Sequence, residues 1–193
     1  MYIGLRKLQT DRTGPEQEEK MDFLTLAQNR YSERFYSDRP VEEDTLAKIL
    51  EAGRIAPTAC NYQPQKIYVL KSEEALAKAA KLTLTYKAPV VLLVCYDSNV
   101  AWTTDKDRFY KPYCVGEQDA SIVASSMMYE AESLGVHTLW MRGFDAQSVI
   151  EAFELPENIR PVMMLALGYP SERSKPGPLH SKRKELSETV TEL

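Results

Sequence analysis

The sequence predicts an α+β fold in one domain. Helical and strand patterns interleave irregularly along the 193 residues, rather than in regular strand–helix–strand units. Residues 90–96 form an apolar run without alternation, which predicts a strand buried on both faces, and residues 162–167 predict a second central strand. Residues 116–134 are small or apolar nearly all round, which predicts a long helix packed on several sides.

Two helices are expected near the start of the folded part. Asp22 is a candidate N-cap of the first helix, with Met21 and Leu26 placed to form a hydrophobic staple around its first turn. The second helix follows Pro40. Acidic residues occupy its first turn, where the helix dipole favours them, and apolar residues recur on one face.

The rest of the chain predicts further strands joined by capped helices. Residues 67–70 predict a strand, and Ser72 is a candidate cap of the Ala-rich helix after it. Gly135 is expected to end the long helix, since glycine is common just past helix ends. Residues 138–141 predict a short strand, and Asp145 is a candidate cap of the helix that follows.

Composition and charge exclude several classes of protein. Lys and Arg total 24 and Asp and Glu total 28, a net charge of −4 that argues against a nucleic-acid partner. No apolar run approaches the roughly 18 residues of a membrane span, and the N-terminus lacks the apolar segment of a secretory signal. Three widely spaced cysteines indicate reduced thiols and a cytoplasmic protein. Residues 9–20 are polar with one Gly-Pro pair, so residues 1–20 are expected to form a flexible leader or arm and the single domain to span residues 21–193.

The motifs that would let side chains carry the chemistry alone are absent from the sequence. It contains neither the Gly-x-Gly-x-x-Gly fingerprint of a dinucleotide site nor the Gly-Lys-Ser/Thr of a phosphate loop. The two histidines, His137 and His180, are not at metal-ligand spacing, so no metal site is expected. Neither is placed to suggest a Ser-His-Asp or Cys-His arrangement. If the protein is an enzyme, a cofactor is therefore expected to supply the chemistry.

Four segments in register resemble the nitroreductase family of FMN-dependent oxidoreductases. They are NRYSERF at 29–35, APTACNYQP at 56–64, GEQDASIV at 116–123, and the closing pair ALGYP at 166–170 and KRKEL at 182–186. The resemblance covers the chain from about Met21 onward. It implies a central mixed sheet flanked by helices, a long central helix, and a homodimer with FMN at shared active sites.

The resemblance implies that the basic residues hold FMN. Arg30 and Ser32 match positions expected near the ribityl-phosphate, and Arg34 matches a basic position near N1 and O2 of the flavin, where a cation stabilises the reduced ring. Tyr31 stands where the family usually has a basic residue, and its contact is expected through the main chain. Lys182 and Arg183 match the C-terminal basic pair of the family and are expected to provide a second set of contacts to the phosphate.

Three further groups are implied by the same resemblance. The turn segment is expected to reach the flavin of the other subunit, through Pro57, Thr58, Ala59, Asn61 and Gln63. A strand end is expected beside N5 of the flavin, at Leu139, Trp140 and Met141. An aromatic lid over the flavin is expected from the long segment 97–115, through Trp102, Phe109, Tyr110 and Tyr113. The alternatives are an ordinary turn, a core tryptophan, and aromatics that fix a loop or fill the dimer interface.

The implied activity is ping-pong hydride transfer from NAD(P)H, through N5 of FMN, to a nitroaromatic, quinone-like or unidentified small-molecule acceptor. Within the fold, a reductive dehalogenase or a flavin-modifying enzyme is the alternative. From other classes, the chain could be an FMN-binding protein with little turnover, or a flavin-free scaffold whose basic residues are solvated surface charges.

Overall fold

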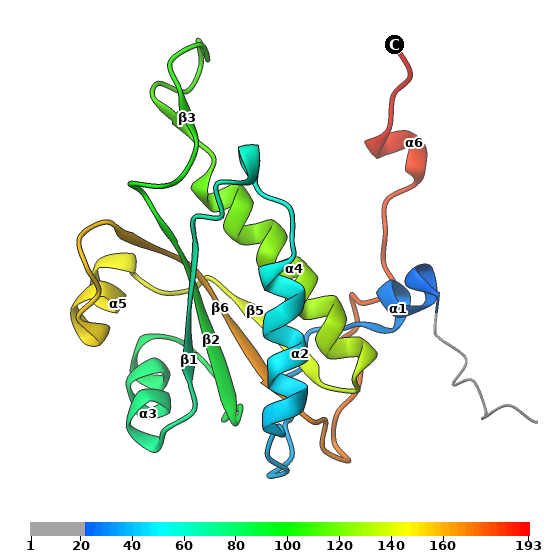
Figure 1. The fold of residues 1–193 in the computed structure, drawn as a ribbon. Coiled ribbons are helices and arrows are strands. Elements are labelled where there is room, and N and C mark those ends of the chain that lie inside the picture. Colours follow the sequence, from blue (N-terminus) through cyan, green and yellow to red (C-terminus); the bar gives the residue numbers. More distant parts are fainter. Residues whose placement is uncertain (1–21) are drawn as a thin grey trace, which may run out of the picture.

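The computed structural model describes residues 22–193, in which a four-stranded sheet lies between two layers of helices (Figure 1). This arrangement confirms the α+β class. The strand order is β1–β2–β6–β5, and a separate two-stranded hairpin pairs β3 with β4. The sheet strands are β1 (Gln65–Leu70), β2 (Val90–Asp97), β5 (His137–Met141) and β6 (Ile159–Gly168). The helices are α1 (Phe23–Asn29), α2 (Glu43–Arg54), the 3-10 turn η1 (Ala59–Asn61), α3 (Glu73–Leu82), α4 (Gly116–Ser133), α5 (Ala146–Phe153) and α6 (Leu186–Thr189). The predicted leader and the Met21 half of the predicted staple lie outside the described residues.

The four-stranded sheet is antiparallel, where the resemblance implies a mixed one. β1 with β2, β2 with β6, and β5 with β6 all pair antiparallel. Leu70 at the end of β1 pairs with Val91 at the start of β2, so the chain reverses direction within α3 and the loop after it. Within residues 22–193, parallel pairing is limited to the single bridge between Ser32 and Thr138.

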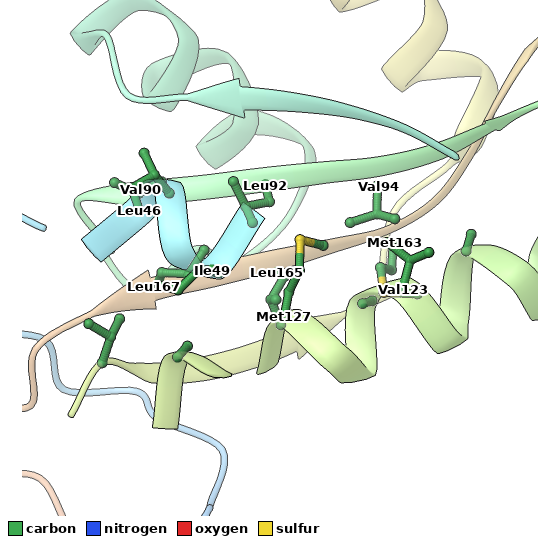
Figure 2. Packing of buried hydrophobic residues seen from close by; sticks show 14 of the residues in the cluster. Leu46, Ile49, Val90, Leu92, Val94, Val123, Met127, Met163, Leu165 and Leu167 are labelled. Carbon is green, nitrogen blue, oxygen red and sulfur yellow. The ribbon is translucent and has the colours of Figure 1, made fainter. Parts of the chain in front are cut away.

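Strand β2 is buried on both faces, as its unbroken apolar run predicts. Val90, Leu92 and Val94 pack toward α2 and α4, together with alternate residues of β6 (Figure 2). Val91 and Leu93 belong to the second core cluster, which α3 and α5 cover on the opposite face. The alternation of side chains along a strand therefore divides one apolar run between two cores.

The three predicted N-caps are confirmed. The side chains of Asp22, Ser72 and Asp145 each accept a hydrogen bond from a backbone N–H in the first turn of α1, α3 and α5, respectively. Gly135 follows the end of α4 with a φ of 72°, a conformation that glycine adopts without steric cost. No helix within residues 22–193 is both long and apolar enough to cross a membrane.

Gly116 allows α4 to begin directly against the sheet. A Cβ added there would lie 2.6 Å from Cγ of Tyr96 and closer still to two other atoms of that ring. We expect Gly116→Ala to lower the free energy of unfolding by about 1–3 kcal/mol, because the ring at the end of β2 must move. Denaturant unfolding of both proteins in the same cofactor state measures the change. Gly143→Ala is the matched control, since its Cβ would meet nothing within 4 Å. Equal stability of the two variants would contradict the close approach.

Candidate functional site

A surface pocket of about 450 Å³ lies between two segments that are far apart in the sequence. Its lining comprises Arg30, Tyr31, Ser32, Arg34, Gly177, Pro178, Leu179, His180 and Arg183. Five residues predicted from the sequence therefore come together here. Lys182 is exposed beside Arg183 but does not line the pocket.

Three guanidinium groups give this pocket its positive charge. Nη1 of Arg34 donates to the carbonyl of Ser32 at 3.0 Å, and Nη1 of Arg183 donates to the carbonyl of Lys182 at 2.8 Å. These bonds to neighbouring carbonyls restrain where the two side chains lie. Together with Arg30, they place arginines from both walls around one cavity, an arrangement that suits a multiply charged anion such as a phosphate.

The first wall is an extended segment held against the edge of the sheet. After α1 ends, Ser32 forms a parallel bridge to Thr138 of β5, and the backbone N–H of Glu33 donates to the carbonyl of Thr138 at 2.9 Å. Side chains of extended residues alternate, so Ser32 and Arg34 point to the side opposite Glu33. The first two line the pocket, whereas Glu33 is only 1% exposed.

The Glu33 carboxylate is the centre of a buried network that the sequence analysis missed. Its Oε1 accepts hydrogen bonds from the backbone N–H groups of Arg34 (2.8 Å) and Phe35 (2.7 Å). Its Oε2 accepts from the hydroxyl of Ser174 and lies 3.1 Å from Nδ1 of His137. Burial raises the pKa of this carboxyl, but the hydrogen bonds outweigh it and bring the pKa below its ordinary value. The charged form of Glu33 is thus the stable one.

Two more ionisable groups interact electrostatically with Glu33. Oε2 of Glu132, on the last turn of α4, is buried and accepts no hydrogen bond in the described part of the chain. Burial raises the pKa of Glu132, against the opposing charges of His137 and Arg30. Burial likewise raises the pKa of Tyr31, whose hydroxyl lies 2.7 Å from Oγ of Ser174.

The predicted turn segment lies at the other end of α4. The backbone N–H of Ala59 donates to Oδ1 of Asp119 in the first turn of α4, and that of Gln63 donates to Oγ1 of Thr58. Asn61 has a positive φ of 57°, within a tight turn. The Ser32 bridge to β5 lies beyond the opposite end of α4. This helix has 18 residues and, at ~1.5 Å per residue, is about 27 Å long, so the two halves of the predicted site lie toward its opposite ends in one chain (Figure 1).

Strand β5 exposes one of its three predicted residues. The side chains of Leu139 and Met141 are 5% and 6% exposed and belong to the core, so they can offer a ligand only their main chain. Trp140 is 37% exposed on the opposite face of the strand. The alternative that Trp140 is a core aromatic is therefore wrong for this chain.

The predicted lid residues lie on a hairpin that projects from the body. β3 (Thr103–Thr104) pairs with β4 (Tyr113–Cys114), and the connecting loop carries Phe109 and Tyr110, which are 87% and 59% exposed. The rings of Phe109 and Tyr110 lie 5.2 Å apart, and Tyr113 lies 5.9 Å from Tyr110. Trp102 is half-buried at the base of the hairpin. In Figure 1 the hairpin stands well away from the segment with the arginine pocket, so in one chain it does not cover that pocket.

Comparison with known proteins gives consistent matches over most of the chain. Residues 27–85 and 78–169 match the sequence model described as the Nitroreductase family. The chain is 31% identical over 161 residues to a Methanothermobacter thermautotrophicus protein whose name includes NAD(P)H nitroreductase, covering 79% of this chain and 80% of that protein. It is 32% identical over 161 residues to the Bacillus subtilis protein named FMN reductase (NAD(P)H), covering 75% of this chain and 64% of that one.

A solved structure extends this likeness to the fold. The crystal structure of a nitroreductase family protein from Clostridium difficile 630 superposes with a TM-score of 0.81 at 39% sequence identity. The superposition covers 89% of this chain and 98% of that one. The likeness therefore includes the sheet and the helices that position the pocket.

Proposed function

Because the chain belongs to the Nitroreductase family, we propose that it is an oxidoreductase that binds FMN and takes its electrons from NAD(P)H. The observation that carries the proposal is the pocket in which three arginines from two distant segments surround one cavity. Such a cavity suits the phosphate of FMN, since guanidinium groups form paired, charge-assisted hydrogen bonds with phosphate oxygens. Ser32 adds a hydroxyl, and His180 adds an imidazole that can also donate to an anion.

We propose that two copies of the chain complete each site. The arginine pocket and the turn at Pro57–Gln63 lie at opposite ends of α4, too far apart to touch one flavin in the same chain. A second copy related by a two-fold axis, with its α4 antiparallel to the first, would bring the turn of one copy to the pocket of the other. Such a two-fold interface is self-complementary and forms both sites at once.

The exposed side of α4 supports this arrangement. A groove between α1 and α4 is lined by Phe23, Pro57, Ser121, Ile122, Ser125, Ser126 and Tyr129. Ile122 is 42% exposed, and Phe23, whose ring lies 5.1 Å from that of Tyr129, is 62% exposed. A row of apolar and small residues on one helix face is suited to close packing against the same face of a second copy.

The residues of the chain bind and position the cofactor rather than carry the hydride themselves. When bound, FMN supplies hydride chemistry that no side chain in the site can supply. The proposed reaction is ping-pong: NAD(P)H is oxidised first and leaves, and a nitroaromatic or quinone-like acceptor is then reduced in the same space. Arg34 is the proposed cation beside the N1 edge of the ring, and the exposed aromatic hairpin is the proposed cover for the site of the partner subunit. The three cysteines in residues 22–193 are unpaired, which supports the cytoplasmic location that we propose.

The colour of the purified protein tests this function directly. We expect a yellow protein whose absorbance is bleached by NADH or NADPH in the absence of oxygen, and restored by a nitroaromatic or a quinone. A colourless protein that free FMN cannot reconstitute would overturn the proposal. A yellow protein that neither nucleotide bleaches would instead support an FMN-binding protein with little turnover.

A further inference from the structure

We propose that Glu33 is a positioning residue that assembles the arginine pocket from its two walls. This inference rests on the proposed function, because it takes the pocket to be the phosphate site of FMN. Glu33 does not line the pocket and would not touch the ligand. Its carboxylate lies behind the wall, where it bonds to three separate parts of the chain.

The first role of Glu33 is to fix the path of the wall that carries Arg34. Its Oε1 accepts the two successive backbone N–H groups of Arg34 and Phe35, at 2.8 and 2.7 Å. Two bonds to consecutive N–H groups set the direction in which the chain turns after the bridge at Ser32. Without this acceptor, the backbone that aims Arg34 into the pocket loses two of its restraints, those on the N–H groups of Arg34 and Phe35.

The second role is to hold the other wall against the first. Ser174 donates its hydroxyl to Oε2 of Glu33, and its oxygen also lies within hydrogen-bond distance of the Tyr31 hydroxyl. Ser174 lies three residues before Gly177, where the second wall begins. Close by, the backbone N–H of Ser171 donates to the carbonyl of Phe35 at 2.8 Å. The buried carboxylate is therefore the polar centre of the contact between the two walls.

The cost of placing a carboxylate here supports a positioning role. A negative charge behind a phosphate pocket repels the ligand, and burial of the charge costs further free energy. Four hydrogen-bond partners compensate Glu33: two backbone N–H groups, the Ser174 hydroxyl and the His137 ring. A valine would fill the space without repulsion, but it would join none of these groups.

The test compares how tightly the proteins bind FMN and riboflavin, which lacks the phosphate. We expect Glu33→Val to lower FMN affinity at least tenfold while changing riboflavin affinity less than twofold. Glu33→Gln should recover part of the loss, since its amide oxygen can still accept the Arg34 and Phe35 N–H groups. Ser174→Ala, which cuts only the link between the walls, should give a smaller loss of the same kind. Fluorescence titration of the flavin-depleted dimer measures all of these affinities.

Glu172→Gln is the charge-matched control, because this exposed residue lies in the same segment as Ser174 and outside the pocket lining. It should leave both affinities unchanged. Equal losses of FMN and riboflavin affinity in Glu33→Val and Ser174→Ala, or no loss in either, would overturn the positioning role. If the unaltered protein itself binds FMN no better than riboflavin, the phosphate pocket is misplaced and the proposed function fails with it.

The pH profile is a second readout of the same proposal. The pKa of Glu33 is lowered by its bonds, so its contribution is complete above the ordinary carboxyl pKa of about 4.3 and is lost as the pH falls through the lowered value. The affinity difference between the unaltered protein and Glu33→Gln should therefore be constant from neutral pH down to about pH 4.3, and should shrink as the pH falls further through the lowered pKa of Glu33. If the difference in FMN affinity stays constant as the pH falls below about 4.3, a role for the charged carboxylate is contradicted.

Discussion

Replacement of Arg30 or Arg183 by alanine is expected to weaken FMN binding by about 10- to 100-fold. The two side chains approach the pocket from opposite walls, so each substitution removes a separate set of hydrogen bonds to the phosphate. Loss of one hydrogen bond to a charged group costs about 1.5–3 kcal/mol, and each 1.4 kcal/mol is about a tenfold change in affinity. Titration with FMN, or the flavin retained after gel filtration, measures the effect. The double variant should lose nearly all bound flavin.

Riboflavin and a remote arginine provide the controls for this result. Riboflavin affinity should change little in either variant, because the lost interaction is with the phosphate. Arg160→Ala removes an exposed guanidinium at the start of β6, one that donates to the carbonyl of Glu157 and does not line the pocket. Full FMN retention in both the Arg30 and Arg183 variants would show that the phosphate lies elsewhere.

Ile122→Glu is expected to convert the proposed dimer to monomers and to abolish FMN retention at the same time. Ile122 lies in the middle of the groove on α4, where the proposed interface would bury the new carboxylate without a partner. Burial of an unpaired charge costs several kcal/mol, enough to reverse the equilibrium of a stable dimer at micromolar concentration. Sedimentation velocity gives the oligomeric state, and the flavin-to-protein absorbance ratio gives the occupancy. The dimer fraction and the flavin occupancy should fall together, although Ile122 is not among the residues that line the arginine pocket of its own chain.

Val100→Glu is the matched control for this experiment. Val100 is 41% exposed, close to the 42% of Ile122, and lies outside the groove. Its substitution should leave both the dimer and the flavin in place. An Ile122→Glu monomer that keeps its FMN would refute the shared site, and an intact dimer would place the interface on another surface.

Local patterns were sufficient to predict most elements of the fold. Asp22, Ser72 and Asp145 mark helix starts because each cap is a bond within three residues, which a sequence displays directly. Strand β2 and its burial on both faces were also predicted, since an unbroken apolar run of strand length is typical of a strand covered on both sides. Arg30 and Arg34 were predicted from the segment at 29–35 and Arg183 from the segment at 182–186, within a resemblance of four segments rather than from any one residue.

The burial of Glu33 could not be predicted, because it depends on distant partners. His137 and Ser174 lie 104 and 141 residues further along the chain, and a glutamate within a polar stretch is ordinarily exposed. The exposure of Trp140 was hidden for a different reason. Leu139, Trp140 and Met141 are all apolar, so this short strand shows no alternation to indicate which side chain faces outward. The length of α4 was predicted, but which segments lie at its two ends depends on tertiary contacts such as the bond from Ala59 to Asp119, which the sequence does not display.

The position of the second pocket wall in the chain has a consequence for biosynthesis. Residues 177–183 follow β6, the last strand of the sheet, so a ribosome makes every strand and both core layers before it makes this wall. Every strand is therefore made before the residues that would hold a phosphate from the second side. Under the proposed function, the two-sided phosphate site is therefore complete only once residues up to Arg183 have been made.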